Sequence, residues 1–201
     1  MKRYTKNQIK ELSEILKNDG VISVPTDTVF GICGSIKSKK AQEKLKSIKE
    51  RPASKPFPIM CSDIEQIKSI ATIDKKSEKI IKEFMPGPIT IVLRKNSQLA
   101  EYINDGKETI AIRMATSNEL KELIKSLGCP VFMTSANKSG EEACKTLEDI
   151  EKKCPDLDGM LEGTVSFGQA STIVDCISNE IKILREGPIS ENEIIKALNK
   201  T

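Results

Sequence analysis

The spacing of apolar positions predicts helices and short strands that alternate along most of the chain. Apolar residues recur every three or four positions in the expected helices and form short β-branched runs in the expected strands. The expected helices are a segment that follows residues 5–8 and stops at Gly20, residues 38–50, a short helix after 62–65, and residues 75–84, 116–127, 147–153 and 191–199. The expected strands are residues 21–24, 57–60, 89–94, 109–113, 130–133, 171–176 and 180–185.

Local signals mark the ends of several expected helices. Thr5-x-x-Gln8, Thr116-x-x-Glu119 and Ser190-x-x-Glu193 resemble capping boxes, and Gly20 and Gly128 are suited to ending a helix. In the last helix, the spacing favours an inner face made of Ile194, Ile195 and Leu198.

The order of the elements predicts an α/β fold with a twisted mixed parallel and antiparallel sheet and flanking helices. Strands alternate with helices early in the chain, and residues 177–179 join the last two strands as a hairpin. Repeats, low-complexity stretches and linkers are absent from the sequence, so we expect a single domain over residues 1–201.

Composition excludes several classes of protein and of chemistry. The chain has 38% hydrophobic and 30% charged residues, a net charge of +3, and no apolar run long enough for a membrane span. Six cysteines lack C-x-x-C spacing, which argues against a zinc site or a disulfide framework; we expect free thiols and a cytoplasmic protein. The chain has no histidine, which excludes a Ser-His-Asp triad and a histidine general base.

Two polar turns follow expected strands. Residues 25–31 form a hydroxyl-containing segment that ends in a glycine, and residues 134–140 offer three hydroxyls, an amide and a glycine. Such turns after strands are where α/β folds place ligands, and they are also ordinary loops, the first of them between a strand and a helix.

A third candidate segment surrounds the end of the second expected helix. Lys49, Arg51 and Lys55 fall within seven residues, with Pro52 between them and Pro56 directly after them. Prolines end helices and stiffen extended segments, so the helix should end near Arg51 and an extended arm should follow. The cations suit an anion, or simply a solvated helix end where positive charge is favourable.

Polar or cationic residues recur at comparable places, near the ends of expected elements: Thr26, Thr28, Lys49, Arg51, Arg113, Ser135, Asn137, Ser171, Thr172 and Arg185. Their repetition predicts a single open cleft that brings Lys49, Arg113 and Ser135 together. Cations and hydroxyls without histidine fit a triphosphate or an acyl phosphate. The sequence contains neither G-x-x-x-x-G-K-[ST] nor G-x-G-x-x-G.

These segments together resemble the YrdC/Sua5 family of threonylcarbamoyl-AMP synthases. The Lys-x-Arg…Ser-x-Asn signature stands at residues 49–51 and 135–137, and residues 25–31 are similar to Pro-Thr-Glu-Thr-x-Tyr-Gly, with Asp27 for Glu and Phe30 for Tyr. Further blocks follow in the family's order at residues 86–90, 110–113, 171–175 and 183–187. The resemblance covers residues 21–187 and is closest to the short form without the C-terminal Sua5 domain.

The resemblance implies a YrdC-like fold with a large cationic concave cleft, and a nucleotidyltransferase reaction. L-threonine, bicarbonate and ATP would yield threonylcarbamoyl-AMP and pyrophosphate, and the product would feed t6A modification of tRNA. A tRNA or a t6A transferase complex would be a partner, and Mg²⁺ would come with ATP rather than be held by the protein alone.

The resemblance also implies site residues. Lys49 and Arg51 would be catalytic and contact the phosphates, and the remaining ATP contacts would come from Thr109, Ser135, Asn137 and Arg185. Threonine or its carbamate would contact Thr28, Arg113, Ser135 and Ser171. Lys55 lies outside the signature, so its removal should matter less. Met60 and Cys61 stand where many members have a histidine near the threonine pocket.

Two other functions are compatible with the resemblance. One is a double-stranded RNA or tRNA-binding module without this activity, although the small net charge and seven aromatic residues argue against RNA as the main ligand. The other is carbamoyl transfer in hydrogenase maturation, where a similar domain occurs within a much longer protein.

Overall fold

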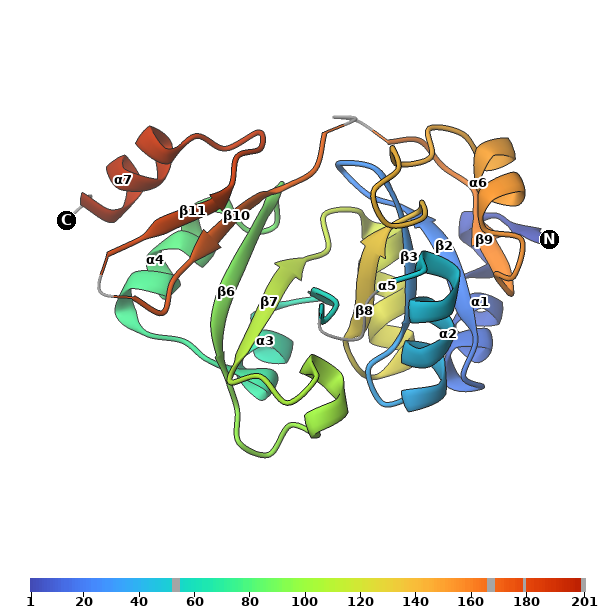
Figure 1. The fold of residues 1–201 in the computed structure, drawn as a ribbon, viewed down its shortest axis with the longest axis horizontal. Helices are drawn as coiled ribbons and strands as arrows, with labels where there is room; N and C mark the ends of the chain where they lie inside the picture. Colours follow the sequence, from blue (N-terminus) through green and yellow to red (C-terminus); the bar gives the residue numbers. More distant parts are fainter. Residues whose placement is uncertain (52–54, 166–168, 179, 200–201) are drawn as a thin grey trace.

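A computed structural model describes residues 1–51, 55–165, 169–178 and 180–199 (Figure 1). Its strands form one mixed sheet in the order β1-β9-β2-β3-β8-β4-β7-β6-β10-β11, with β5 paired to β6. The strands are β1 (Arg3–Tyr4), β2 (Val21–Pro25), β3 (Phe30–Ser35), β4 (Ile59–Cys61), β5 (Ala71–Thr72), β6 (Ile89–Lys95), β7 (Thr109–Met114), β8 (Val131–Ser135), β9 (Gly159–Leu161), β10 (Thr172–Asp175) and β11 (Lys182–Arg185).

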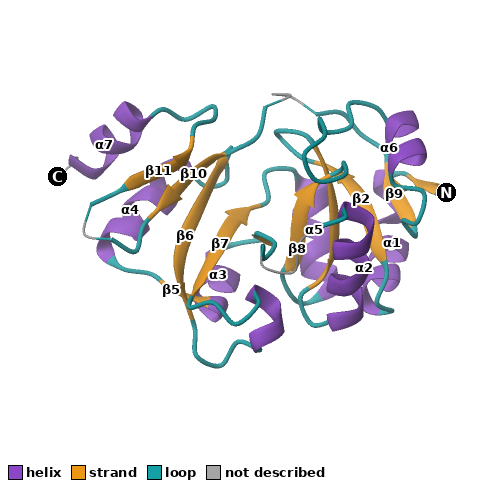
Figure 2. Cartoon of the chain, in the orientation of Figure 1, coloured by secondary structure: helices purple, strands orange, loops and turns teal. Residues whose placement is uncertain are grey.

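Helices flank this sheet, so the prediction of an α/β fold with a mixed sheet is confirmed (Figure 2). They are α1 (Ile9–Lys17), α2 (Lys39–Lys49), α3 (Ile64–Ile70), α4 (Lys75–Phe84), α5 (Asn118–Leu127), α6 (Leu147–Lys153) and α7 (Glu191–Asn199), with 3-10 turns at Lys6–Gln8 and Glu101–Asn104. None of the helices in these residues is long and apolar enough to cross a membrane.

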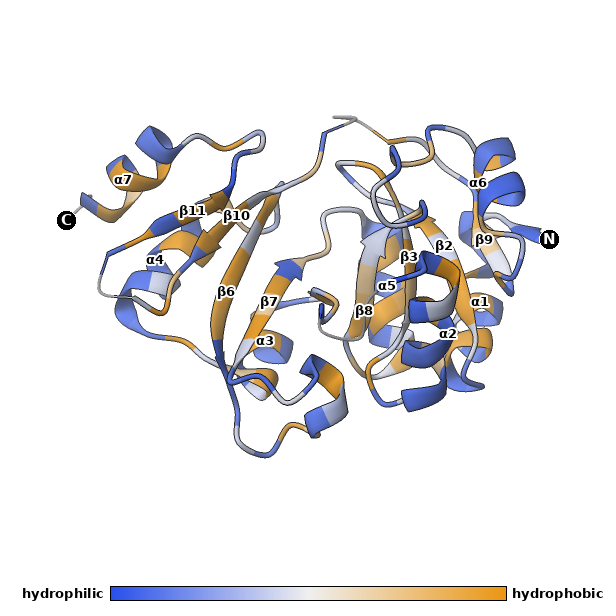
Figure 3. Ribbon diagram, viewed as in Figure 1, coloured by the Kyte–Doolittle hydropathy of each residue, from blue (hydrophilic) through white to orange (hydrophobic). Residues whose placement is uncertain are grey.

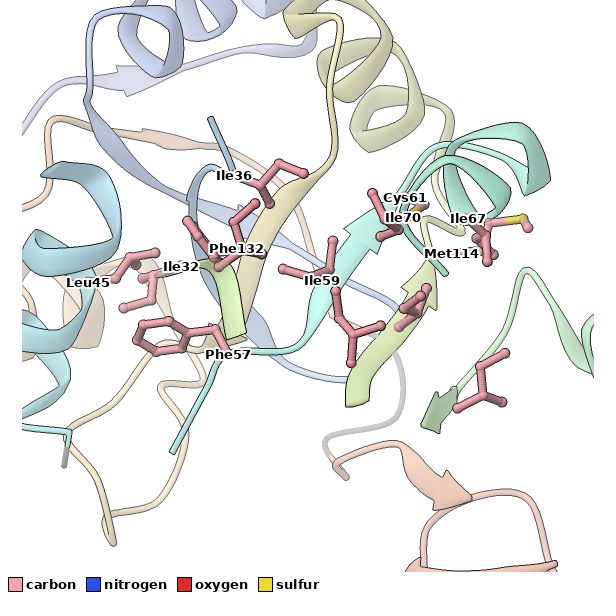
Figure 4. Packing of buried hydrophobic residues seen from close by; sticks show 14 of the residues in the cluster. Ile32, Ile36, Leu45, Phe57, Ile59, Cys61, Ile67, Ile70, Met114 and Phe132 are labelled. Carbon is pink, nitrogen blue, oxygen red and sulfur yellow. The ribbon is translucent and has the colours of Figure 1, made fainter. Parts of the chain in front are cut away.

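The strands in the middle of the sheet supply two hydrophobic cores, because alternate side chains point to opposite faces. On β4, Ile59 and Cys61 belong to the larger core and Met60 belongs to the smaller one. The smaller core packs under α1 and α5, and the larger one packs under α2 and continues toward α3 and α4. Figure 4 shows part of the larger core, where Phe57 meets Phe132 edge to face at 6.1 Å.

Figure 3 shows the resulting pattern, with apolar strands inside and polar residues on the outer sides of the helices. This arrangement leaves the polar turns at the strand ends as the places where side chains can meet a ligand.

The alternative in which residues 25–31 are an ordinary loop between a strand and a helix is wrong. They form the turn of a β-hairpin in which β2 and β3 pair antiparallel, with Pro25 opposite Phe30. The strand β3 was missed because its two glycines lower the local β-propensity. Both glycines allow close packing: a Cβ on Gly31 would lie 2.5 Å from Met133 Sδ, and one on Gly34 would lie 2.9 Å from Ala41 Cβ.

Several boundaries also differ from expectation. The cap of α5 is Ser117, whose Oγ accepts the Leu120 N–H at 3.1 Å, and not Thr116. The residue Ile195 is 45% exposed, because α7 buries Ile194 and Ala197 one helical step away. The short strands β1, β5 and β9 were not predicted.

Other expectations are confirmed. The helices α4, α6 and α7 have the predicted bounds, and Gly128 ends α5 in the left-handed conformation. The strands β10 and β11 pair antiparallel as predicted, although position 179 of their connection lies outside the described residues. The same holds for positions 52–54 of the proposed stiff arm.

Candidate active site

A cavity of about 380 Å³ lies where the ends of several strands meet the end of α2. Its walls come from the β2–β3 turn, the C-terminal end of α2, the segment after β8, and the ends of β6, β7, β10 and β11. The lining residues are Thr26, Thr28, Val29, Gly31, Lys49, Arg51, Lys55, Pro58, Thr90, Arg113, Met133, Thr134, Ser135, Asn137, Ser139, Gly140, Ala170, Ser171, Ile173 and Arg185.

The prediction that Lys49, Arg113 and Ser135 share one cleft is confirmed. Of the residues expected to bind ATP or threonine, only Thr109 does not line this cavity. It begins β7 opposite Arg94, on the same face of the strand as Arg113 and about 13 Å along it. ATP could therefore contact Thr109 only if it extended beyond this cavity.

Lys49 forms part of one wall from inside the protein. It is the last residue of α2 and is only 2% exposed. Its Nζ donates to Asn137 Oδ1 at 2.7 Å and to Ser135 O at 2.8 Å, and Ser135 Oγ lies at 3.4 Å. Burial and the nearby charge of Arg51 lower the pKa of Lys49 to about 8.

Arg51 and Lys55 present cationic side chains beside Lys49. The Nε of Arg51 donates to Lys55 O at 2.8 Å, its Nη2 donates to Pro56 O at 3.0 Å, and its guanidinium lies 4.9 Å from the ring centre of Phe57. Partial burial lowers the pKa of Arg51. The side chain of Lys55 is exposed. The carbonyl groups and the aromatic ring fix the Arg51 guanidinium without neutralising its charge.

Arg113 enters the opposite wall from the end of β7 and is 8% exposed. Its Nη2 pairs with Asp27 Oδ1 at 2.8 Å and donates to Gly87 O at 3.3 Å, and its Nη1 donates to Thr28 Oγ1 at 3.2 Å. Thr28 Oγ1 also lies 3.0 Å from Thr26 Oγ1. The carboxylate of Asp27 therefore compensates the charge of Arg113 and helps to orient it.

Arg185 lies beside Arg113 and is held by Ser171, the residue before β10. Its Nε and Nη2 donate to Ser171 O at 3.0 and 2.8 Å, and Ser171 Oγ lies 2.7 Å from Thr90 Oγ1. Burial and the charge of Arg113 lower the pKa of Arg185. The Nη1 group has no protein partner among the described residues, so both of its N–H groups can bind a ligand.

The charges around the cavity are unbalanced. Lys49, Arg51, Lys55 and Arg185 form no ion pair with a carboxylate within the described ranges, whereas Arg113 is paired with Asp27. None of the described lining residues is acidic. A site with several uncompensated cations and buried hydroxyls favours a ligand with several negative charges.

Sequence reasoning gave too little weight to four contributors: Thr26, Asp27, Lys55 and Thr90. Asp27 and Thr90 contact site residues that lie in distant segments of the chain. Thr26 contacts Thr28 two positions along the chain, and Lys55 brings an exposed charge to the cavity. In the sequence, Thr26, Asp27 and Thr90 lie inside the matching blocks, and Lys55 lies in the cationic segment after the second expected helix.

The expected free cysteines are confirmed: all six are unpaired and buried, and none lines the cavity. Within the residues that the structure describes, no group of three or more His, Cys, Asp or Glu side chains could hold a metal ion.

Comparison with known proteins gives a consistent result. A sequence model of the family described as Telomere recombination, which covers Sua5, YciO and YrdC, matches residues 14–187. The chain belongs to this family. All the site residues discussed above lie within the matched region.

Relatives in this family are similar over nearly the whole chain. The threonylcarbamoyl-AMP synthase of Bacillus subtilis is 31% identical over 194 residues, which are 93% of this chain and 55% of that protein. The crystal structure of Pyrococcus abyssi Sua5 complexed with L-threonine superposes with a TM-score of 0.92 and 25% identity, covering 98% of this chain and 60% of that one. The chain thus spans little more than half the length of these two relatives.

Escherichia coli YciO has the same fold at closer to the same length. Its crystal structure superposes with a TM-score of 0.87 and 22% identity, covering 96% of this chain and 98% of that one. This likeness supports the fold.

Proposed function

We propose that this member of the family is a threonylcarbamoyl-AMP synthase, which converts L-threonine, bicarbonate and ATP into threonylcarbamoyl-AMP and pyrophosphate. The observation that carries the proposal is the charge balance of the cavity, where four cations lack a carboxylate partner beside buried hydroxyls. The names of the Bacillus and Pyrococcus relatives support the same activity and threonine as a substrate.

The chemistry needs little from protein acids and bases. The neutral amine of threonine and bicarbonate form a carbamate and release water, and a carbamate oxygen then attacks the α-phosphorus of ATP. The bond from that phosphorus to the bridging oxygen breaks, and pyrophosphate leaves with the electron pair. A site for such a displacement has to align the two anions and offset their charge.

The residues divide between the two ends of the substrate. Arg51 and Lys55 face the phosphates from the α2 side, and Ser135 and Asn137 bind nucleotide oxygens next to them. On the other side, Arg113 receives the carboxylate of threonine.

Thr28 and Ser171 line the space next to Arg113, where threonine or its carbamate would lie. Arg185 stands between the two ends, with Nη1 free to contact either the carbamate or ATP.

A divalent cation would enter with the nucleotide. Because none of the described lining residues is a carboxylate, phosphate oxygens and water would supply most of the ligands of Mg²⁺. When bound, the ion would offset phosphate charge alongside the cationic side chains. The product would supply t6A modification of tRNA in the cytoplasm, where thiols such as the six unpaired cysteines stay reduced.

The test is pyrophosphate release by the purified protein, with each substrate omitted in turn. Release should require threonine, bicarbonate and ATP together, because neither threonine nor bicarbonate alone provides the carbamate. Arg51→Ala should lower the rate roughly a hundred- to a thousandfold while the melting temperature changes little. Threonine-independent release, or a near-normal rate in Arg51→Ala, would refute the proposal, and double-stranded RNA that ATP fails to displace would point to a binding module instead.

A further inference from the structure

Lys49 is less available to a ligand than any other cation of the cavity. Only 2% of it is exposed, whereas Arg51 is half-buried and Lys55 is exposed. The two shortest hydrogen bonds of its Nζ go to Asn137 Oδ1 and Ser135 O, and the third acceptor within reach is Ser135 Oγ. An ammonium group has three N–H donors, so these contacts occupy all of them.

The same contacts connect α2 to the segment of residues 135–141, which we call the 135–141 turn. Ser139 donates its backbone N–H to Lys49 O at 2.8 Å, and Lys138 forms an ion pair with Glu50 at 2.5 Å. The side chain of Asn137 continues the connection, since its Nδ2 donates to Lys138 O at 2.9 Å and to Glu141 O at 2.7 Å. Lys49 is the buried centre of this arrangement.

We propose that Lys49 is a positioning residue, whose ammonium holds the 135–141 turn against the end of α2 and does not itself contact the phosphates. The turn brings Ser135, Asn137, Ser139 and Gly140 to the cavity. Loss of Lys49 would therefore displace the groups that bind the nucleotide, and Arg51 and Lys55 would remain as the cations in direct contact. The inference rests on the proposed function for the identity of the nucleotide, ATP.

The protonation state of Lys49 distinguishes a positioning role from direct contact with the phosphates. The ionisable groups near Lys49 are Arg51, Cys144 and Cys154. Burial raises the pKa of both thiols, and the pKa of Lys49 is lowered to about 8, so Lys49 is the first of these groups to change charge above neutral pH. A neutral amine keeps two N–H donors, enough for Asn137 Oδ1 and Ser135 O, so the turn stays in place after deprotonation.

The first experiment is a double-mutant cycle on ATP affinity, measured by calorimetry with MgATP and without threonine or bicarbonate. Lys49→Met and Asn137→Ala should each weaken binding about tenfold, and the double variant should be little weaker than the worse single one, because both remove the same connection. Lys39→Met, which changes an exposed lysine of the same helix, is the matched control and should leave affinity unchanged. A hundredfold loss in the double variant would mean independent contacts and would overturn the proposal.

The second experiment uses charge and pH. Lys49→Arg keeps the positive charge but puts a larger planar group in the buried slot, so it should weaken ATP binding as Lys49→Met does; normal affinity would overturn the proposal. Between pH 7.5 and 9.5, above the phosphate pKa of about 6, wild-type affinity should show no loss that is absent from Lys49→Met. A loss approaching tenfold per pH unit above 8, seen only in the wild type, would show direct charge contact.

These measurements do not depend on turnover. If wild-type protein binds ATP but releases no pyrophosphate with threonine and bicarbonate, the proposed reaction fails while the positioning role of Lys49 is still tested. If pyrophosphate release requires all three substrates, but the losses of ATP affinity caused by Lys49→Met and Asn137→Ala multiply in the double variant, only the positioning role fails.

Discussion

The pair formed by Asp27 and Arg113 allows a quantitative test of how the cavity is built. Its side chains are 13% and 9% exposed, and the Oδ1–Nη2 distance is 2.8 Å. The second oxygen of Asp27 and the Nε of Arg113 are buried and have no hydrogen-bond partner. Asp27→Asn keeps an oxygen for Nη2 and removes the charge, so its effects report on charge compensation rather than on shape.

The expected loss of stability follows from burial. Removing one partner of a buried ion pair costs about 3–5 kcal/mol, and the retained oxygen of Asn places this variant near the lower end, about 3 kcal/mol. For a chain of this length, each kcal/mol lowers the melting temperature by about 2–4 °C, which gives a fall of about 6–12 °C. Glu14→Gln removes an ion pair of the same 2.8 Å length from an exposed helix face and should cost less than about 1 kcal/mol.

Asp27→Asn should lower stability without lowering the affinity for threonine. A carboxylate held by Arg113 would lie about 7 Å from Asp27, where repulsion at an effective dielectric constant of about 20 amounts to about 2 kcal/mol. Asp27→Asn should therefore retain threonine affinity or tighten it by up to about thirtyfold. Thermal melting and threonine binding in the presence of ATP measure the two effects. An unchanged melting temperature, or a clear loss of threonine affinity in Asp27→Asn, would refute the charge-compensation argument.

Two further predictions concern an exposed charge and the buried cysteines. Lys55→Ala keeps the backbone carbonyl that accepts from Arg51 Nε and removes one exposed ammonium, so ATP affinity should fall about fivefold, a smaller loss than the one expected for Arg51→Ala. Lys10→Ala on α1 is the control, and equal losses of ATP affinity in the two lysine variants would contradict the assignment of Lys55 to the phosphates. All six thiols should be unreactive toward a thiol reagent in the native protein and react together after unfolding, because every cysteine is buried and unpaired; an intramolecular disulfide found by mass spectrometry of freshly isolated protein would contradict this.

Much of the fold could be predicted because its signals are local. The bounds of α4, α6 and α7 follow from apolar spacing and capping residues within a few positions of each end. The strand β3 was not predicted because its signals are not local. Gly31 and Gly34 weaken the strand pattern in the sequence, and they are needed for close packing against Met133 and Ala41, which lie elsewhere in the chain.

The candidate site could likewise be predicted only in part. The sequence indicated which residue types gather at strand ends and that they would share one cleft, because turns after neighbouring strands meet at the same side of a sheet. Thr109 stands about 13 Å along the strand from Arg113, and only the folded structure shows that the cavity ends before it.

The sequence by itself determined the helices, most strands, the chemical character of the cavity and the family resemblance, because each depends on residue types within short segments. Only the tertiary structure decided which cations keep their charge available. Asp27 neutralises Arg113 from 86 positions away, and Asn137 occupies the ammonium of Lys49 from 88 positions away. Compensation and burial depend on neighbours in space, and the folding of β2, α2, β7 and β8 into one sheet with its helix places those neighbours together.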